Sequence, residues 1–322
     1  MRIIKNKYTL LKIALFMTIF SCDMTDGTHK YKTLRFTQAD QQFSIVSFYL
    51  HMEEYIKLGK ENRKQIDRIY KKYVYDPIWK DFASKGECSF LAKSLKNPIK
   101  DLQGLSSEIT VLSKSGVEEI VKKALINISE VLRGPHTTVY LQVIDPIYKN
   151  YIPKNLQTGL VAHTFGSGRI FIAIDPTTST WRDQLLKIVA HEYHHSVWIS
   201  RNFKTVNFSL LEYLILEGRA DSFSNLVYPN IESPWTNIFG RKKEQNIWHN
   251  IKNDLHNRDE YLNMKMAVGD KDIPFASAYT IGYRIMQEFL NNNPGMTILE
   301  WTDMAATEIL LKSKYEEQLN KH

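Results

Sequence analysis

Cysteine is scarce in this chain of 322 residues, which contains only two, and no pair of cysteines has the spacing C-x-x-C. These absences exclude a disulfide scaffold, a thiolate zinc site and a C-x-x-C redox motif. Any metal site must therefore be built from histidine, aspartate and glutamate. We interpret Cys88 as a small buried apolar residue without a chemical role.

The chain after residue 21 also lacks a block of positive charge. The formal net charge is +7, but four cations lie in the first 21 residues, which carry no acidic residue, so the remainder carries only +3. This small charge is spread along the chain and argues against a nucleic-acid partner. With 43% hydrophobic and 24% charged residues, the chain has the composition of an ordinary globular protein with a large core.

The apolar run near the N-terminus is short. Residues 13–20 are eight mostly apolar residues after a basic stretch, which is typical of a secretory signal and too short to span a membrane as a stable helix. Ile19-Phe20-Ser21-Cys22 resembles the bacterial lipobox, although Phe20 is bulkier than usual. The resemblance implies a signal peptide of residues 1–21, diacylation of Cys22, and a protein anchored to the bacterial cell membrane on its extracytoplasmic face. The alternatives are an uncleaved anchor and an ordinary signal with a chance cysteine.

The hydrophobic pattern predicts an α+β fold with a small sheet and an all-helical C-terminal half. Residues 38–83 show apolar residues at helical spacing and predict two helices that form a cap. Residues 115–133 predict an amphipathic helix that ends at Gly134-Pro135. Three strands are expected next, the last two as a hairpin, at residues 137–144, 160–164 and 169–174. Only helices are expected after them, at residues 180–200, 209–228, 245–255, 276–291 and 297–311. Two of these begin with capping-box spacing, at Ser209 with Glu212 and at Thr297 with Glu300.

The motif that indicates chemistry is His191-Glu192-Tyr193-His194-His195, which contains H-E-x-x-H inside a predicted helix. One helical turn separates His191 from His195, so both imidazoles can reach one tetrahedral ion. Glu192 then lies beside the open position of the metal, where a carboxylate can take a proton from water. The alternative is a solvated helix that happens to carry three histidines.

Two histidines leave a catalytic zinc one protein ligand short, and the next predicted helix offers a third. Glu217 and Asp221 stand one turn apart on a helix whose other positions are rich in leucine. Inward-facing acids are costly unless they are paired or bind metal. We therefore predict Glu217 as the third ligand and Asp221 as the acceptor of a hydrogen bond from a ligand histidine. An exposed charged face is the alternative.

These residues carry a family resemblance. H-E-x-x-H followed by E-x-x-x-D on the next helix resembles the gluzincins, the thermolysin-like branch of zinc peptidases. More closely, residues 115–315 resemble a bacterial family of zinc-dependent proteases that is classed as a domain of unknown function. The matching segments are Glu217-Gly-Arg-Ala-Asp221, Ile273-Pro274, residues 278–283 and residues 309–315, and Ala278 departs from the glycine that the family usually has there.

The resemblance implies a zincin-like metalloprotease fold with one Zn²⁺ ion, held by His191, His195 and Glu217, and with Glu192 as the base. The expected organisation follows from it. Residues 22–114 form a helical N-terminal region, or cap, and residues 115–322 form the catalytic domain. Within this domain the sheet and the H-E-x-x-H helix occupy residues 115–200, and a helical lobe occupies residues 201–322.

Other side chains around the site are open to more than one interpretation. Tyr279, or alternatively Tyr283 one turn later, can stabilise an oxyanion, or both rings fill the core. His194 is expected beside the ligands or in packing, with replacement of a ligand at i+3 spacing as the alternative. His163, His249 and His256 are interpreted as surface or strand histidines, with assistance to the oxyanion as the alternative. The loop of residues 230–245 either borders the site or packs.

The sequence therefore predicts a membrane-anchored zinc metallopeptidase whose partner is a peptide or protein substrate, with residues 169–174 as an edge strand that pairs with it. Two alternatives stay open. One is an inactive relative that holds zinc as a binding module, and the other is a zinc amidase that acts on cell-wall substrates by the same chemistry.

Overall fold

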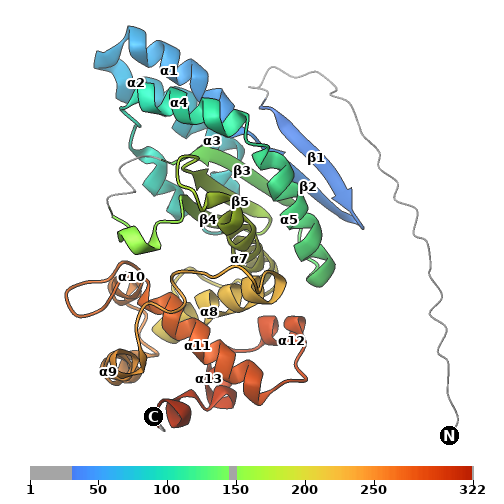
Figure 1. Ribbon diagram of the computed structural model, residues 1–322, viewed down its shortest axis with the longest axis vertical. Coiled ribbons are helices and arrows are strands. Elements are labelled where there is room, and N and C mark those ends of the chain that lie inside the picture. Colours follow the sequence, from blue (N-terminus) through green and yellow to red (C-terminus); the bar gives the residue numbers. More distant parts are fainter. Residues whose placement is uncertain (1–30, 145–150, 321–322) are drawn as a thin grey trace, which may run out of the picture. The chain divides into compact units, whose positions relative to one another are not determined.

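The computed structural model of the protein describes residues 31–144 and 151–320 (Figure 1). The predicted signal segment and Cys22 lie outside the described residues, so the lipid anchor stays a prediction. Among the residues that the structure describes, no helix combines the length and the apolar character needed to cross a membrane.

A mixed sheet of five strands lies in the N-terminal half. Its order is β1 (Thr33–Gln38), β2 (Gln41–Val46), β3 (Thr137–Val143), β5 (Arg169–Ile174) and β4 (Leu160–Gly166). The outer pairs β1–β2 and β4–β5 are antiparallel, whereas β3 is parallel to both β2 and β5. The predicted α+β class and the β4–β5 hairpin are confirmed.

Two expectations about the sheet are wrong. The first is the helix expected from residue 38, since residues 41–46 form β2, where Phe43 and Ile45 are buried and alternate with the more exposed Gln42 and Ser44. Apolar residues there fit either period, and the expectation overlooked the hairpin that β2 forms with β1 directly before it. The second is the edge position of residues 169–174: β5 is paired on both sides, and the edge strand is β4.

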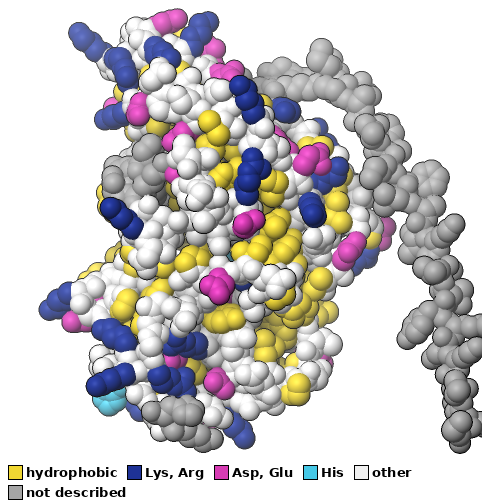
Figure 2. Space-filling view, viewed as in Figure 1, with side chains coloured by type: hydrophobic (Ala, Val, Ile, Leu, Met, Phe, Trp, Pro, Cys, Tyr) yellow, Lys and Arg dark blue, Asp and Glu magenta, His cyan; other side chains and the backbone are white. Residues whose placement is uncertain are grey.

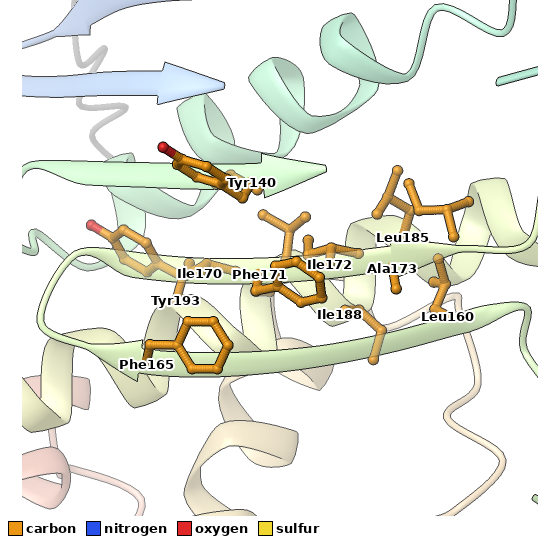
Figure 3. Close-up of a cluster of buried hydrophobic side chains, with 14 of the residues drawn as sticks. Tyr140, Leu160, Phe165, Ile170, Phe171, Ile172, Ala173, Leu185, Ile188 and Tyr193 are labelled. Atoms are coloured by element: carbon orange, nitrogen blue, oxygen red, sulfur yellow. The ribbon is translucent and has the colours of Figure 1, made fainter. Parts of the chain in front are cut away.

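The helix α7 (Trp181–Asn202) packs against one face of this sheet. The register pairs Val139 with Ile170 and Leu141 with Ile172, all fully buried. Figure 3 shows Leu185, Ile188 and Tyr193 of α7 beside β4 and β5. Because residues of opposite parity on each strand face the other side of the sheet, α7 and the neighbouring helix of residues 117–131 cover one apolar face, and the helices of residues 52–113 cover the other.

The remaining elements are helical. The N-terminal helices are α1 (Met52–Glu61), α2 (Ile66–Tyr70), α3 (Asp76–Asp81), α4 (Leu102–Ser113) and α5 (Val117–Val131). The C-terminal helices are α8 (Leu210–Val227), α9 (Arg241–Ile251), α10 (Glu260–Val268), α11 (Ser277–Asn292), α12 (Ile298–Asp303), α13 (Ala306–Ser313) and α14 (Tyr315–Leu319).

Figure 2 shows Lys and Arg side chains next to Asp and Glu side chains on one face, with apolar side chains gathered between them.

Both predicted capping boxes are confirmed, at Ser209 with Glu212 and at Thr297 with Glu300. The single helix expected over residues 297–311 is instead two, α12 and α13, which are separated at Met304 and Ala305. The break frees the carbonyl of Met304, which accepts a hydrogen bond from the buried guanidinium of Arg219. A helix interior would have used that carbonyl for its own ladder.

The helices α8 and α11 cross with their backbones in close contact. A Cβ atom placed on Gly218 of α8 would overlap the backbone of Gly282 of α11, and a Cβ atom placed on Gly282 would overlap the carbonyl of Leu214. Two helix backbones can approach this closely only where no side chain stands between them. Gly218 follows Glu217 directly, so this crossing decides where the Glu217 carboxylate lies.

We expect Gly218→Ala to destabilise the protein by about 1–3 kcal/mol, because overpacking a contact between two backbones costs more than the roughly 1 kcal/mol of helix propensity that alanine gains. Thermal unfolding of the purified variant measures this. Gly295→Ala is the matched control, because a Cβ there meets no atom within 4 Å. Equal melting temperatures for the two variants would contradict the prediction.

Candidate metal centre

The H-E-x-x-H motif lies in the middle of α7, between the sheet and the C-terminal helices. His191, Glu192 and His195 are each at most 9% exposed, and so is Glu217 on α8. The solvated helix and the exposed charged face, which were the alternatives for these residues, are therefore wrong. Burying two imidazoles and two carboxylates requires that each polar group finds a partner.

Three of these side chains converge on one point. The distance from His191 Nε2 to His195 Nε2 is 2.9 Å, and Glu217 Oε2 lies 3.3 Å from the first nitrogen and 3.4 Å from the second. These three residues form the group that could hold a metal ion within the described part of the chain. Helical spacing brings the two histidines together, and the crossing of α8 and α11 places the carboxylate beside them.

The triangle has the size that a tetrahedral ion needs. Ligand atoms about 2.0–2.1 Å from zinc at tetrahedral angles lie about 3.3 Å apart, close to the distances found here. Glu217 Oε2 is buried and has no hydrogen-bond partner among the described residues. A buried carboxylate oxygen that faces two imidazole nitrogens is the donor set that zinc prefers, so the three residues fit the ion.

Asp221, one turn after Glu217, lies on the outer side of His191. Its Oδ1 is 3.0 Å from His191 Nδ1, and a carboxylate in that position accepts the Nδ1 proton. With the proton held at Nδ1, the lone pair of His191 Nε2 faces Glu217 and His195, as metal binding requires. The structure thus gives Asp221 the hydrogen bond that the sequence predicted.

The charges in this cluster shift one another strongly. Burial opposes protonation of His191, but Asp221 and Glu217 outweigh it and raise its pKa well above the ordinary value. Burial raises the pKa of Glu217, but His195 and His191 outweigh it and lower that pKa to about 2. The anionic Glu217 therefore favours a positive charge beside it. A proton on His191 and a metal cation compete to supply that charge.

Glu192 points to the sheet and not into the triangle. Its Oε2 lies 2.6 Å from Thr164 Oγ1, which is also 2.9 Å from the Glu192 backbone carbonyl. Thr164 belongs to the edge strand β4. The sequence did not indicate this residue, because the contact joins an edge strand to a helix that comes after the whole β4–β5 hairpin.

Two phenols, those of Tyr279 and Tyr213, lie near the His191, His195 and Glu217 cluster. The Tyr279 ring centroid is 6.1 Å from that of His191, and Tyr279 shares a hydrogen bond with Tyr213. The charge of Glu217, followed by burial, raises the pKa of Tyr279 well above 10, so its phenol keeps a proton to donate. For Tyr283, one turn later on α11, burial and then the charge of Asp221 raise the pKa. Tyr213 stands one turn before Glu217, and this spacing could have revealed it.

Two other histidines, His194 and His163, lie near the metal centre in different surroundings. The ring of His194 stacks on Trp301 of α12, and its Nε2 is 3.1 Å from Thr302 Oγ1, so its contacts are those of a packing residue. His163 lies on β4, where burial lowers its pKa although the charges of Glu192 and Glu217 oppose the shift. The sequence placed His163 without suitable neighbours, and the structure places it near both carboxylates.

The fold and the cluster define a mixed α+β protein with a buried His-His-Glu group that could bind metal. A family described as a predicted Zn-dependent protease (DUF2268) matches the chain over residues 117–311. The chain belongs to this family, and the matched region contains His191, His195 and Glu217. The resemblance seen in the sequence is thereby confirmed. Comparisons with curated proteins and with solved structures found no match.

We expect zinc binding to release protons near pH 7, because the raised pKa of His191 keeps it protonated in the metal-free protein and a zinc ligand must be neutral. Zinc affinity should fall as the pH decreases, by up to about tenfold per pH unit for each proton released. Calorimetry in buffers of different ionisation enthalpy measures the release. His249→Ala, an exposed control on α9, should behave as wild type. A zinc affinity independent of pH would contradict the prediction.

Proposed function

We propose that the protein is a zinc metallopeptidase that hydrolyses peptide bonds with one Zn²⁺ ion held by His191, His195 and Glu217. The observation that supports this most directly is the triangle of ligand atoms with edges of 2.9–3.4 Å, together with a buried Glu192 that follows His191 in the sequence and is held by Thr164 outside the triangle. A structural zinc site is usually closed by four protein ligands. Three ligands with an adjacent carboxylate favour an enzyme over a zinc-holding binding module.

The proposed chemistry assigns a task to each side chain. Zinc, when bound, polarises the scissile carbonyl and acidifies the attacking water. Glu192 accepts the proton of this water as the new C–O bond forms, and delivers it to the amine nitrogen as the C–N bond breaks. The hydroxyl of Thr164 holds the Glu192 carboxylate in place. The phenol of Tyr279 donates a hydrogen bond to the oxyanion.

The substrate is proposed to be an extended peptide that pairs with β4. Among the described strands, β4 pairs with β5 alone, and near its C-terminal end the Phe165 carbonyl accepts a hydrogen bond from the Cys88 amide at 2.8 Å. No second strand of the described residues pairs with this side of β4, and we propose that the peptide adds there as a strand. Because Thr164 lies on this strand and contacts Glu192, a peptide bound there passes the base.

We expect Glu192→Gln to reduce peptide hydrolysis by about 10²–10⁴-fold, because the amide cannot accept a proton. Zinc binding should persist, since Glu192 is not one of the three ligands. The measurement is mass-spectrometric digestion of a peptide library by the zinc-loaded protein. Glu308→Gln, which changes an exposed carboxylate on α13, is the matched control and should cut as wild type does.

Each outcome of this digestion discriminates between functions. Cleavage by wild type and Glu308→Gln alone supports the peptidase. Full activity in Glu192→Gln would contradict the proposed mechanism. If wild type binds zinc but cuts only cell-wall fragments, the protein is an amidase, and if it binds zinc but cuts neither class of substrate, it is a zinc-holding module.

We expect Tyr279→Phe to reduce kcat by about 10²–10³-fold, the usual cost of losing one oxyanion donor. Binding of zinc should change little. Tyr283→Phe is the comparison, because this phenol lies on the same helix one turn farther along. A larger loss of kcat in Tyr283→Phe than in Tyr279→Phe would assign the oxyanion role to Tyr283.

A further inference from the structure

The loop between α8 and α9 sends one side chain to the metal centre. Trp235 is partly buried, and its Nε1 donates a hydrogen bond to Asp221 Oδ1 at 2.9 Å. This is the same oxygen that accepts the Nδ1 proton of His191 at 3.0 Å. One carboxylate oxygen therefore receives two N–H donors, one from the proposed zinc ligand and one from the loop.

Asp221 depends on these two donors for its orientation. The residue is 1% exposed, and its other oxygen, Oδ2, has no hydrogen-bond partner among the described residues. The torsion that rotates an aspartate carboxylate is broad and poorly restricted by its own bonds. Without Trp235, His191 would be the single donor to Oδ1 among the described residues, and the carboxylate could rotate to satisfy Oδ2 at the expense of His191.

Trp235 is itself held by the helix that carries Tyr279. Thr280 Oγ1 of α11 donates a hydrogen bond to the backbone carbonyl of Trp235 at 2.7 Å, and Thr280 is fully buried. The Trp235 and Tyr279 rings meet edge to face, with centroids 6.5 Å apart. Both the backbone and the ring of Trp235 are therefore held by α11, which gives the indole N–H a defined direction.

We propose that Trp235 is a positioning residue of the metal centre: its indole N–H fixes the Asp221 carboxylate, which in turn holds His191 with its Nε2 lone pair facing the ion. The proposal rests on the proposed zinc site. It gives the loop between α8 and α9 a role in metal affinity, although no residue of this loop is a ligand. Partners of this kind typically change metal affinity by about 10–100-fold when they are removed.

The test compares the zinc affinity of wild type, Trp235→Phe and Trp248→Phe by competition with a chelator. Phenylalanine keeps an aromatic ring and removes the N–H. We expect Trp235→Phe to weaken zinc binding by about 10-fold or more. Trp248→Phe is the matched control, because Trp248 Nε1 is buried without a hydrogen-bond partner among the described residues, and we expect its zinc affinity to equal that of wild type.

A double-mutant cycle separates positioning from general loss of structure. In an Asp221→Ala background, Trp235→Phe should cause less than about a twofold further loss, because its effect passes through the missing carboxylate. Equal losses with and without Asp221 would overturn the proposal, as would a wild-type affinity in Trp235→Phe, and either result leaves the zinc site standing. If wild type itself binds no zinc, the proposed function and this inference fall together.

Discussion

The C-terminal half is organised around one buried carboxylate. Glu217 is only 7% exposed, and its Oε2 lies 3.3 and 3.4 Å from the Nε2 atoms of His191 and His195. A buried anion without compensating positive charge is unstable by several kcal/mol. The raised pKa of His191 lets a proton on this residue provide that charge, or a metal ion provides it in place of the proton. The chain must therefore bring α7 and α8 together accurately, since a displaced carboxylate would be buried without a partner.

The Gly218 and Gly282 contact makes this accuracy possible. It lets α8 and α11 touch through their backbones, which leaves no side chain that could adjust and shift the helices. Glu217 precedes one glycine, and Tyr279 stands one turn before the other. The same contact therefore determines where the anionic ligand lies and where the phenol faces it. Gly218 and Gly282, in the segments of residues 217–221 and 278–283, therefore determine how the two helices pack. This role is separate from the proposed chemistry.

Local spacing was enough to predict the residues that share a helix, and it failed where a contact joins distant segments. His191 with His195, and Glu217 with Asp221, follow from helical periodicity, so these pairs could be read from the sequence. Thr164 could not, because its link to Glu192 depends on how the β4–β5 hairpin folds onto α7. For Trp235 the sequence left open whether the loop of residues 230–245 borders the site or packs, since an irregular loop has no periodicity. The strand β2 was expected to be helical because its few apolar residues fit either period, although its antiparallel partner β1 directly precedes it in the sequence.

The helix α7 joins two halves that each orient one part of the proposed chemistry. From the sheet side, Thr164 holds the Glu192 carboxylate at 2.6 Å. From the helical side, Glu217 and Asp221 hold the two functional nitrogens of His191. The proton acceptor and the metal ligands are thus adjacent in sequence but are positioned by different layers of the protein. A shift of the sheet relative to α8 would move the base away from the metal without breaking a single ligand contact. Catalysis of the proposed kind therefore depends on how α7 packs on both sides, and this explains why the helix is buried along the motif although the motif itself is polar.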